Sequence, residues 1–126
     1  MRVPIGGGVV RPVVDTQPNM TAWALAADAR SVFWVEWAPT GYALYRAPKD
    51  GGDRTLVGLA AAQVMHRDNR DHLELDDTHA YWNTRDSVVR VAKGGGTVEE
   101  VLRLARGDVM SFAMDKTDVY LAVVLF

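Results

Sequence analysis

The sequence contains no cysteine and only three histidines in 126 residues. Without cysteine the chain has no disulfide, no thiol nucleophile and no cysteine-ligated zinc site. It also lacks an apolar run near the roughly 18–20 residues that a membrane-spanning helix needs, so no membrane span is expected. The first residues, Met1–Gly6, do not include the apolar stretch of a signal peptide, and a cytoplasmic location is the default expectation.

Neither sign of charge is in excess. The 14 Lys and Arg residues are nearly balanced by 16 Asp and Glu residues, which gives a net charge of −2. This leaves no basic field to gather phosphates, so nucleic acid is not expected as a partner. What remains is an ordinary globular composition, and the length suits one domain with a sizeable core.

The chain repeats itself at a fixed spacing, and such a repeat decides the fold class before any single motif does. Arg2, Arg46 and Arg90 are 44 residues apart. They begin three similar strings, RVPIGGG, RAPKDGG and RVAKGGG. A second series consists of three aspartates that each precede an aromatic residue by five positions: Asp28, Asp76 and Asp115.

The best-preserved copy predicts four short strands joined by tight turns. Leu73 and Leu75 alternate with polar residues, which is the period of a strand. Aromatic and β-branched residues favour the next two strands, and Gly94–Gly96 supplies the positive φ angles of the last hairpin. The predicted strands are Asp71–Leu75, His79–Thr84, Ser87–Ala92 and about Val98–Leu104.

A helix is the competing interpretation of Val98–Arg106, because this segment contains good helix formers. The matching segment of the earlier copy, Asp53–Leu59, is rich in β-forming residues and holds a glycine. Equivalent segments are expected to share one state, and this favours a strand.

Four-stranded units repeated every 40–45 residues or so are typical of a β-propeller, in which each unit is one radial blade. The strings FWVEW…LYRAPKDGG and YWNT…VRVAKGGG resemble the YWTD-type blades of the low-density lipoprotein receptor family, which also occur in bacterial tandem-repeat proteins. This resemblance implies six-bladed architecture and leaves function open, because propellers host many activities. The acidic residue that ends the motif is Glu36 here but is replaced by Thr84 and Val123.

The repeat divides the chain into three blade equivalents, one of which is split between the two ends. Residues 19–62 and 67–107 are two complete blades, residues 108–126 supply strands one and two of the split blade, and residues 1–18 supply its strands three and four. The predicted fold is therefore all-β, a half-propeller or a propeller fragment.

Two explanations of the split blade are open. In the first, two chains meet head to tail and close a six-bladed ring as a homodimer. In the second, the chain is one piece of a longer propeller whose other blades are absent, and it would be exported if that propeller is secreted. A single chain would otherwise leave an apolar strand edge open, which is an aggregation hazard.

The tryptophans are the leading candidates for ligand contacts. Trp34 and Trp82 could stack on sugars or bases, yet their recurrence at the same blade position favours packing between sheets. Trp23 and Trp37 have no counterpart in the second copy. They are therefore better candidates for binding a protein or a carbohydrate.

The repeated polar residues receive structural interpretations. The three aspartates could act as acid–base groups or calcium ligands, but an Asx turn after the first strand of each unit explains their repetition. Arg46 and Arg90 are expected to pair with a carboxylate or with carbonyl oxygens at a strand end, and Arg2 belongs to the same series.

His72 is the remaining candidate, because it lies on an innermost strand and could face a central channel. A similarity to lactonase-type propellers would place a metal there, but the other copies provide no matching ligands. Three functions therefore stand: a non-enzymatic binding or scaffold module without a cofactor, a metal-dependent enzyme of the lactonase or lyase type, and a fragment without activity of its own.

Overall fold

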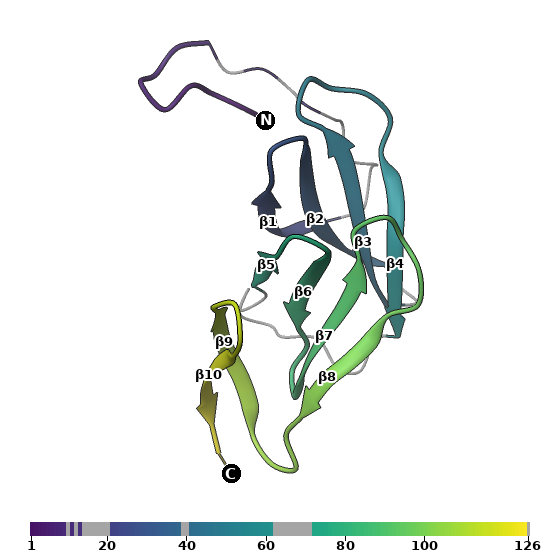
Figure 1. The fold of residues 1–126 in the computed structure, drawn as a ribbon, viewed down its shortest axis with the longest axis vertical. Coiled ribbons are helices and arrows are strands. Elements are labelled where there is room, and N and C mark those ends of the chain that lie inside the picture. The colour runs from purple at the N-terminus through teal and green to yellow at the C-terminus, as the bar shows by residue number, and fades with distance from the viewer. Residues whose placement is uncertain (10, 12, 14–20, 39–40, 62–71, 126) are drawn as a thin grey trace.

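The structure is a computed structural model that describes residues 1–9, 11, 13, 21–38, 41–61 and 72–125. Over these ranges it contains ten β-strands and no helix, which confirms the all-β prediction (Figure 1). The strands form two four-stranded sheets and one two-stranded sheet, and all neighbours are antiparallel. No element of these ranges is a helix long and apolar enough to cross a membrane.

The first sheet contains β1 (Thr21–Ala27), β2 (Ser31–Ala38), β3 (Gly41–Pro48) and β4 (Thr55–Ala61) in chain order. Each strand pairs with the next one along the chain, so the sheet is a meander. A bulge interrupts β1 between Trp23 and Leu25. At the bulge, Ala24 has a φ of 44°, in the left-handed region that residues with a side chain rarely adopt.

The second sheet contains β5 (Leu73–Leu75), β6 (His79–Asn83), β7 (Ser87–Ala92) and β8 (Glu99–Arg103) in the same order. The four strands lie where the sequence predicts them, except that Asp71 is outside the described residues. The helix alternative for Val98–Arg106 is wrong, because β8 pairs with β7 from Glu99 to Arg103, with one bulge. Pairing with β7 satisfies backbone groups that a helix this short would leave open at its ends.

Two further hairpins flank these sheets. β9 (Asp108–Met114) and β10 (Val119–Val124) form the two-stranded sheet. At the other end of the chain, Arg2 and Arg11 form an antiparallel bridge with N–H···O distances of 2.7 and 2.9 Å, and we call residues 2–11 the N-terminal hairpin. The predicted unit boundaries at residues 18, 19, 62 and 67 lie outside the described residues.

The N-terminal hairpin has the same geometry as the last hairpin of each four-stranded sheet. The residues that face each other are Arg2 and Arg11, Arg46 and Thr55, and Arg90 and Glu99. Each turn is closed by a glycine N–H that donates to the carbonyl oxygen three residues earlier, at 2.9–3.0 Å: Gly7, Gly51 and Gly95. Their φ values of 89°, 94° and 101° explain why glycine recurs there.

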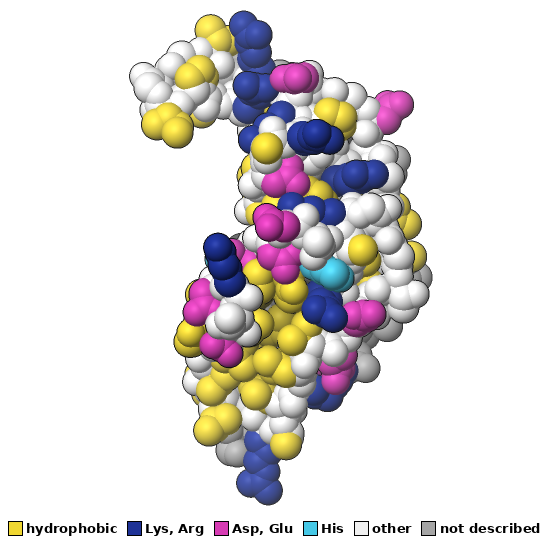
Figure 2. Space-filling view, in the orientation of Figure 1, with side chains coloured by type: hydrophobic (Ala, Val, Ile, Leu, Met, Phe, Trp, Pro, Cys, Tyr) yellow, Lys and Arg dark blue, Asp and Glu magenta, His cyan; other side chains and the backbone are white. Residues whose placement is uncertain are grey.

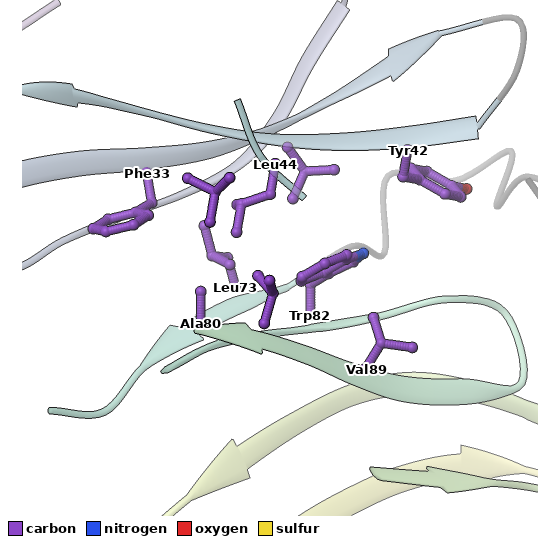
Figure 3. Packing of buried hydrophobic residues seen from close by; sticks show 10 residues of the cluster. Phe33, Tyr42, Leu44, Leu73, Ala80, Trp82 and Val89 are labelled. Atoms are coloured by element: carbon purple, nitrogen blue, oxygen red, sulfur yellow. The ribbon is translucent and has the colours of Figure 1, made fainter. Parts of the chain in front are cut away.

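The main core lies between the two four-stranded sheets. Figure 3 shows Phe33 and Leu44 of the first sheet pointing toward Leu73, Ala80 and Trp82 of the second. The buried members of this cluster are Phe33, Val35, Tyr42, Leu44, Val57, Leu73, Ala80, Trp82, Val89 and Val91. A smaller core joins the second sheet to β9 through Tyr81, Val88, Val109 and Phe112.

We call the N-terminal hairpin and the last hairpin of each four-stranded sheet the outer hairpins, and they contact their neighbours in the same way at two junctions. The Gly96 N–H donates to the Val57 carbonyl oxygen at 3.3 Å, and a methyl group added to Gly95 would lie 3.6 Å from that oxygen. A methyl group added to Gly51 would lie 3.4 Å from the carbonyl oxygen of Val13. The residues of the second contact, Gly51 and Val13, each precede their counterparts Gly95 and Val57 by 44 positions. The N-terminal hairpin and the following Val13 therefore pack on the first sheet as the first sheet packs on the second.

Candidate functional site

A groove of about 640 Å³ lies between the N-terminal hairpin and the first sheet. The hairpin side contributes Met1, Arg2 and Val13. On the sheet side the groove is lined by four alanines and Leu25 of β1, by Val32 and by Trp34, and Lys49 also borders it. The groove is therefore mainly apolar, with two cations at its border, which suits a ligand with an apolar face and an acidic group.

Trp34, on the sheet side of the groove, is positioned by a polar cluster around Glu36. This side chain is 0% exposed. Its Oε1 accepts a hydrogen bond from Trp34 Nε1 at 2.9 Å, and both carboxylate oxygens accept from Arg54 Nη1, at 3.0 and 2.8 Å. The Arg54 guanidinium carbon lies 4.2 Å from the ring centroid of Tyr45, which stacks on Trp34. Each carboxylate oxygen thus has a donor, as a buried ion pair requires.

The three repeated aspartates close equivalent turns. In each, Oδ1 accepts the N–H groups of the residues two and three positions further on, at 2.6–2.9 Å. This is the geometry of an Asx turn. In the exposed turn at Asp115, the N–H groups of Thr117 and Asp118 and the hydroxyl of Tyr120 lower the pKa of the aspartate to about 2.

The second oxygen of each aspartate has a donor that depends on the neighbouring residues. Tyr81 Oη donates to Asp76 Oδ2 at 2.9 Å, and the equivalent tyrosine of β10 donates to Asp115 at 2.8 Å. Phe33 holds this position in β2 and has no hydroxyl. Lys93 Nζ of the second sheet donates to Asp28 Oδ2 instead, at 3.0 Å, so this ion pair crosses between the sheets.

We expect Asp28→Asn to destabilise the fold at neutral pH and to lose its effect in acid. Burial raises the pKa of Asp28, but the N–H of Arg30, the ammonium of Lys93 and a second N–H outweigh it, and the pKa falls from 3.8 to about 2. A carboxylate with a depressed pKa stabilises the fold above its unfolded pKa and loses this contribution as the pH falls through the folded value. Urea unfolding should show a loss of about 1–2 kcal/mol at pH 7 that shrinks from pH 4 toward pH 2.

Asp77→Asn is the matched control, since Asp77 lies beside the equivalent turn and its replacement removes the same charge. Its effect on the free energy of unfolding should be within about 0.5 kcal/mol at either pH. An equal loss at pH 7 and near pH 2 for Asp28→Asn would show that the charge does not carry the effect.

The repeated arginines lie at the start of each outer hairpin. Arg90 Nε donates to Glu99 Oε2 at 3.1 Å, and hydrogen bonds with Tyr81 and with Glu99 raise the pKa of Arg90. Arg46 lies opposite Phe33 in the first sheet. Arg2 lies at the border of the groove, where Nη1 donates to the carbonyl oxygen of Lys49 at 3.0 Å and to the Asp50 carboxylate at 3.3 Å.

The structure separates the two tryptophans that the sequence treats as equivalent. Both are buried, but Trp82 lies in the core between the two sheets, whereas Trp34, 4% exposed, borders the groove. Neither Arg54 nor Tyr45, which position Trp34, is identified by the sequence. The only local signal was the Trp-x-Glu spacing, which puts Trp34 and Glu36 on one face of β2.

The other ligand candidates lie at one end of the two sheets, opposite the aspartate turns. Trp23 pairs with Val35 and Trp37 with Thr21, and the side chains of these two tryptophans are outside the description. His72 precedes β5, where its Nε2 lies 2.7 Å from Glu74 Oε1 and its ring meets Phe112 edge to face at 5.3 Å. The backbone N–H of His72 donates to Asn83 Oδ1 at 2.7 Å.

The described part of the chain holds no group of three or more His, Asp or Glu side chains placed to bind one metal ion, and His66 lies outside it. Comparison with known proteins finds no matching protein-family model, no matching curated protein and no matching solved structure.

Proposed function

We propose that the chain is a segment of a β-propeller and that it acts as a non-enzymatic binding or scaffold module. In this proposal the two four-stranded sheets are blades of the YWTD type. The β9–β10 hairpin is the inner half of a third blade, and the N-terminal hairpin is an outer half.

The repeated junction between outer hairpins supports this proposal most directly. Gly95 meets the Val57 carbonyl oxygen at one junction, and Gly51 meets the Val13 carbonyl oxygen at the other. Units that repeat one contact are related by one rotation, which is the condition for a radial array of blades. A constant rotation also supports the closure of the array into a ring.

The ligand surface that we propose for such a ring is the end of the sheets that carries Trp37, Trp23 and His72. The opposite end is occupied by the Asx turns, whose carboxylates are already engaged with backbone and side-chain donors. Loops at one end of a rigid β-scaffold commonly hold binding sites. A protein or a carbohydrate is the ligand class that tryptophan residues at such an end would suit.

A tandem chain tests the propeller. Two copies of residues 1–126, joined by a Gly–Ser linker, should fold as a monomer, because each β9–β10 hairpin can then complete a blade with an N-terminal hairpin. We expect a monomeric mass by light scattering and a higher melting temperature than that of the single chain. The control is a tandem chain without its last hairpin, residues 108–126. A tandem chain that melts no higher than this control would overturn the proposal.

A further inference from the structure

The outer face of the β9–β10 sheet carries an aromatic ring that its counterparts bury. Phe33 in β2 and Tyr81 in β6 hold the same position after the turn aspartate, and each packs against the following sheet with 1% and 8% of its surface exposed. Tyr120 in β10 is 56% exposed. Figure 2 shows hydrophobic side chains gathered over the region of β9 and β10. This face therefore has the composition of one that contacts a further sheet.

In the described part of the chain, the groove on the first sheet lacks a neighbour on the opposite side: it is a surface whose counterparts are covered by a pair of inner strands. Trp82 in β6 and Leu121 in β10 face the preceding sheet, where Trp82 joins the main core and Leu121 packs on the smaller one. Trp34 holds the same position in β2 and faces the groove. Across the groove, the described ranges contain an outer hairpin but no inner pair of strands to go with it.

The groove has room for an aromatic ring because four of the five β1 residues that line it are alanines, the fifth being Leu25. Ala22, Ala24 and Ala26 line it, and Ala24 lies at the bulge, where its φ is left-handed. A pair of inner strands whose outer face carries Tyr120 and Ala122 has the matching shape, with one large residue beside small ones.

We propose that a second copy of the chain fills this groove with its β9–β10 hairpin, and that its β10 pairs with the N-terminal hairpin so that Tyr120 lies opposite Arg2. The pairing repeats that of Tyr81 with Arg90 in the second sheet. Two such junctions close a head-to-tail dimer and leave neither edge open. This inference rests on the proposed function, because it extends the blade geometry across two chains.

The charges on the two surfaces are complementary. Between the two sheets, Lys93 lies 3.0 Å from Asp28 of the preceding unit and 5.9 Å from the centroid of the aromatic ring that follows this aspartate. The residue equivalent to Lys93 in the first sheet is Lys49, which borders the groove. The same geometry places Lys49 of one copy beside the ionised Asp115 of the other.

Light scattering after size exclusion gives the first test. The chain should elute with twice its mass of 13.9 kDa. Tyr120→Lys removes the ring and brings a cation toward Lys49 and Arg2 of the other copy. The dissociation constant of the dimer should therefore rise by about tenfold or more. Tyr120→Phe is the matched control and should remain a dimer. A monomeric wild-type chain, or a Tyr120→Lys variant that dimerises as well as the control, would overturn the inference.

Disulfide trapping tests the register, and the absence of cysteine makes the reaction clean. The pair equivalent to Ala80 and Val91 would be Val119 of one copy and Val3 of the other. A mixture of Val3→Cys chains and Val119→Cys chains should cross-link under mild oxidation. A mixture of Ile5→Cys and Val119→Cys chains, shifted by two residues, should cross-link about tenfold less. Because Ile5 is the more exposed position, random collision would favour it, and equal yields would reject the register.

The two proposals fail in different ways. A tandem chain that closes while the single chain stays monomeric keeps the propeller and rejects the dimer of separate chains. A dimer that cross-links only at other positions keeps self-association and rejects this surface. A tandem chain that does not close rejects both.

Discussion

Trp82→Ala is expected to lower the free energy of unfolding by about 3–5 kcal/mol. The ring is fully buried between the two four-stranded sheets, where it packs with Phe33, Leu44 and Val89. Removing it withdraws a large apolar surface and leaves a cavity that both sheets line, and two stiff sheets close such a cavity only partly. Urea unfolding at one fixed protein concentration gives the measurement, because the proposed self-association would add to the observed stability.

Substitution of the same ring by phenylalanine separates its volume from its polar group. Among the described residues, Trp82 Nε1 has no hydrogen-bond acceptor, whereas Trp34 Nε1 donates to Glu36 Oε1 at 2.9 Å. Trp82→Phe removes a buried N–H that has no partner there and should cost only about 1 kcal/mol. Trp34→Phe takes a donor away from a buried carboxylate and should cost about 2–3 kcal/mol. The opposite order of the two losses would contradict this account.

The strands and turns were predictable because their causes are local. Glycines with positive φ, such as Gly95, and aspartates that accept the next N–H groups, such as Asp76, act within a few residues. Their repetition also fixed which strands form one unit, and it decided correctly for a strand at Glu99–Arg103. Helix propensity alone would predict a helix in this segment. Pairing with β7 overrides that local preference.

The groove was not predictable because its parts meet only through register and packing. Arg54 reaches Glu36 from 18 positions away in the sequence, and Lys93 reaches Asp28 from 65 positions away. The left-handed φ at the bulge belongs to an alanine, Ala24, so no glycine in the sequence indicates it. Sequence equivalence also gave Trp34 and Trp82 one role, although a single neighbour, Glu36 in place of threonine, gives their N–H groups different surroundings.

Gly107→Ala is expected to destabilise the β9–β10 hairpin by about 2–5 kcal/mol and to abolish dimer formation with it. Gly107 has a φ of 100°, which strains any residue with a side chain. An added methyl group would also overlap the carbonyl oxygen of Val124, at the end of β10. That oxygen belongs to the backbone ladder and cannot turn away as a side chain can. The hairpin would have to shift as a whole.

Gly95→Ala provides the matched control for this clash. Gly95 has a φ of 101°, so the backbone strain is the same, but its added methyl group would lie 3.6 Å from the nearest backbone oxygen, an ordinary contact. The loss for Gly95→Ala should therefore stay near about 1–2 kcal/mol, the cost of strain alone. The excess for Gly107→Ala measures how tightly β10 holds the chain at residue 107. Because β10 is the strand that we expect to dock on the second copy, light scattering should show Gly107→Ala as a monomer and Gly95→Ala as a dimer. Equal losses of stability for the two variants would show that Val124 yields to the methyl group and that the hairpin is not anchored at this point.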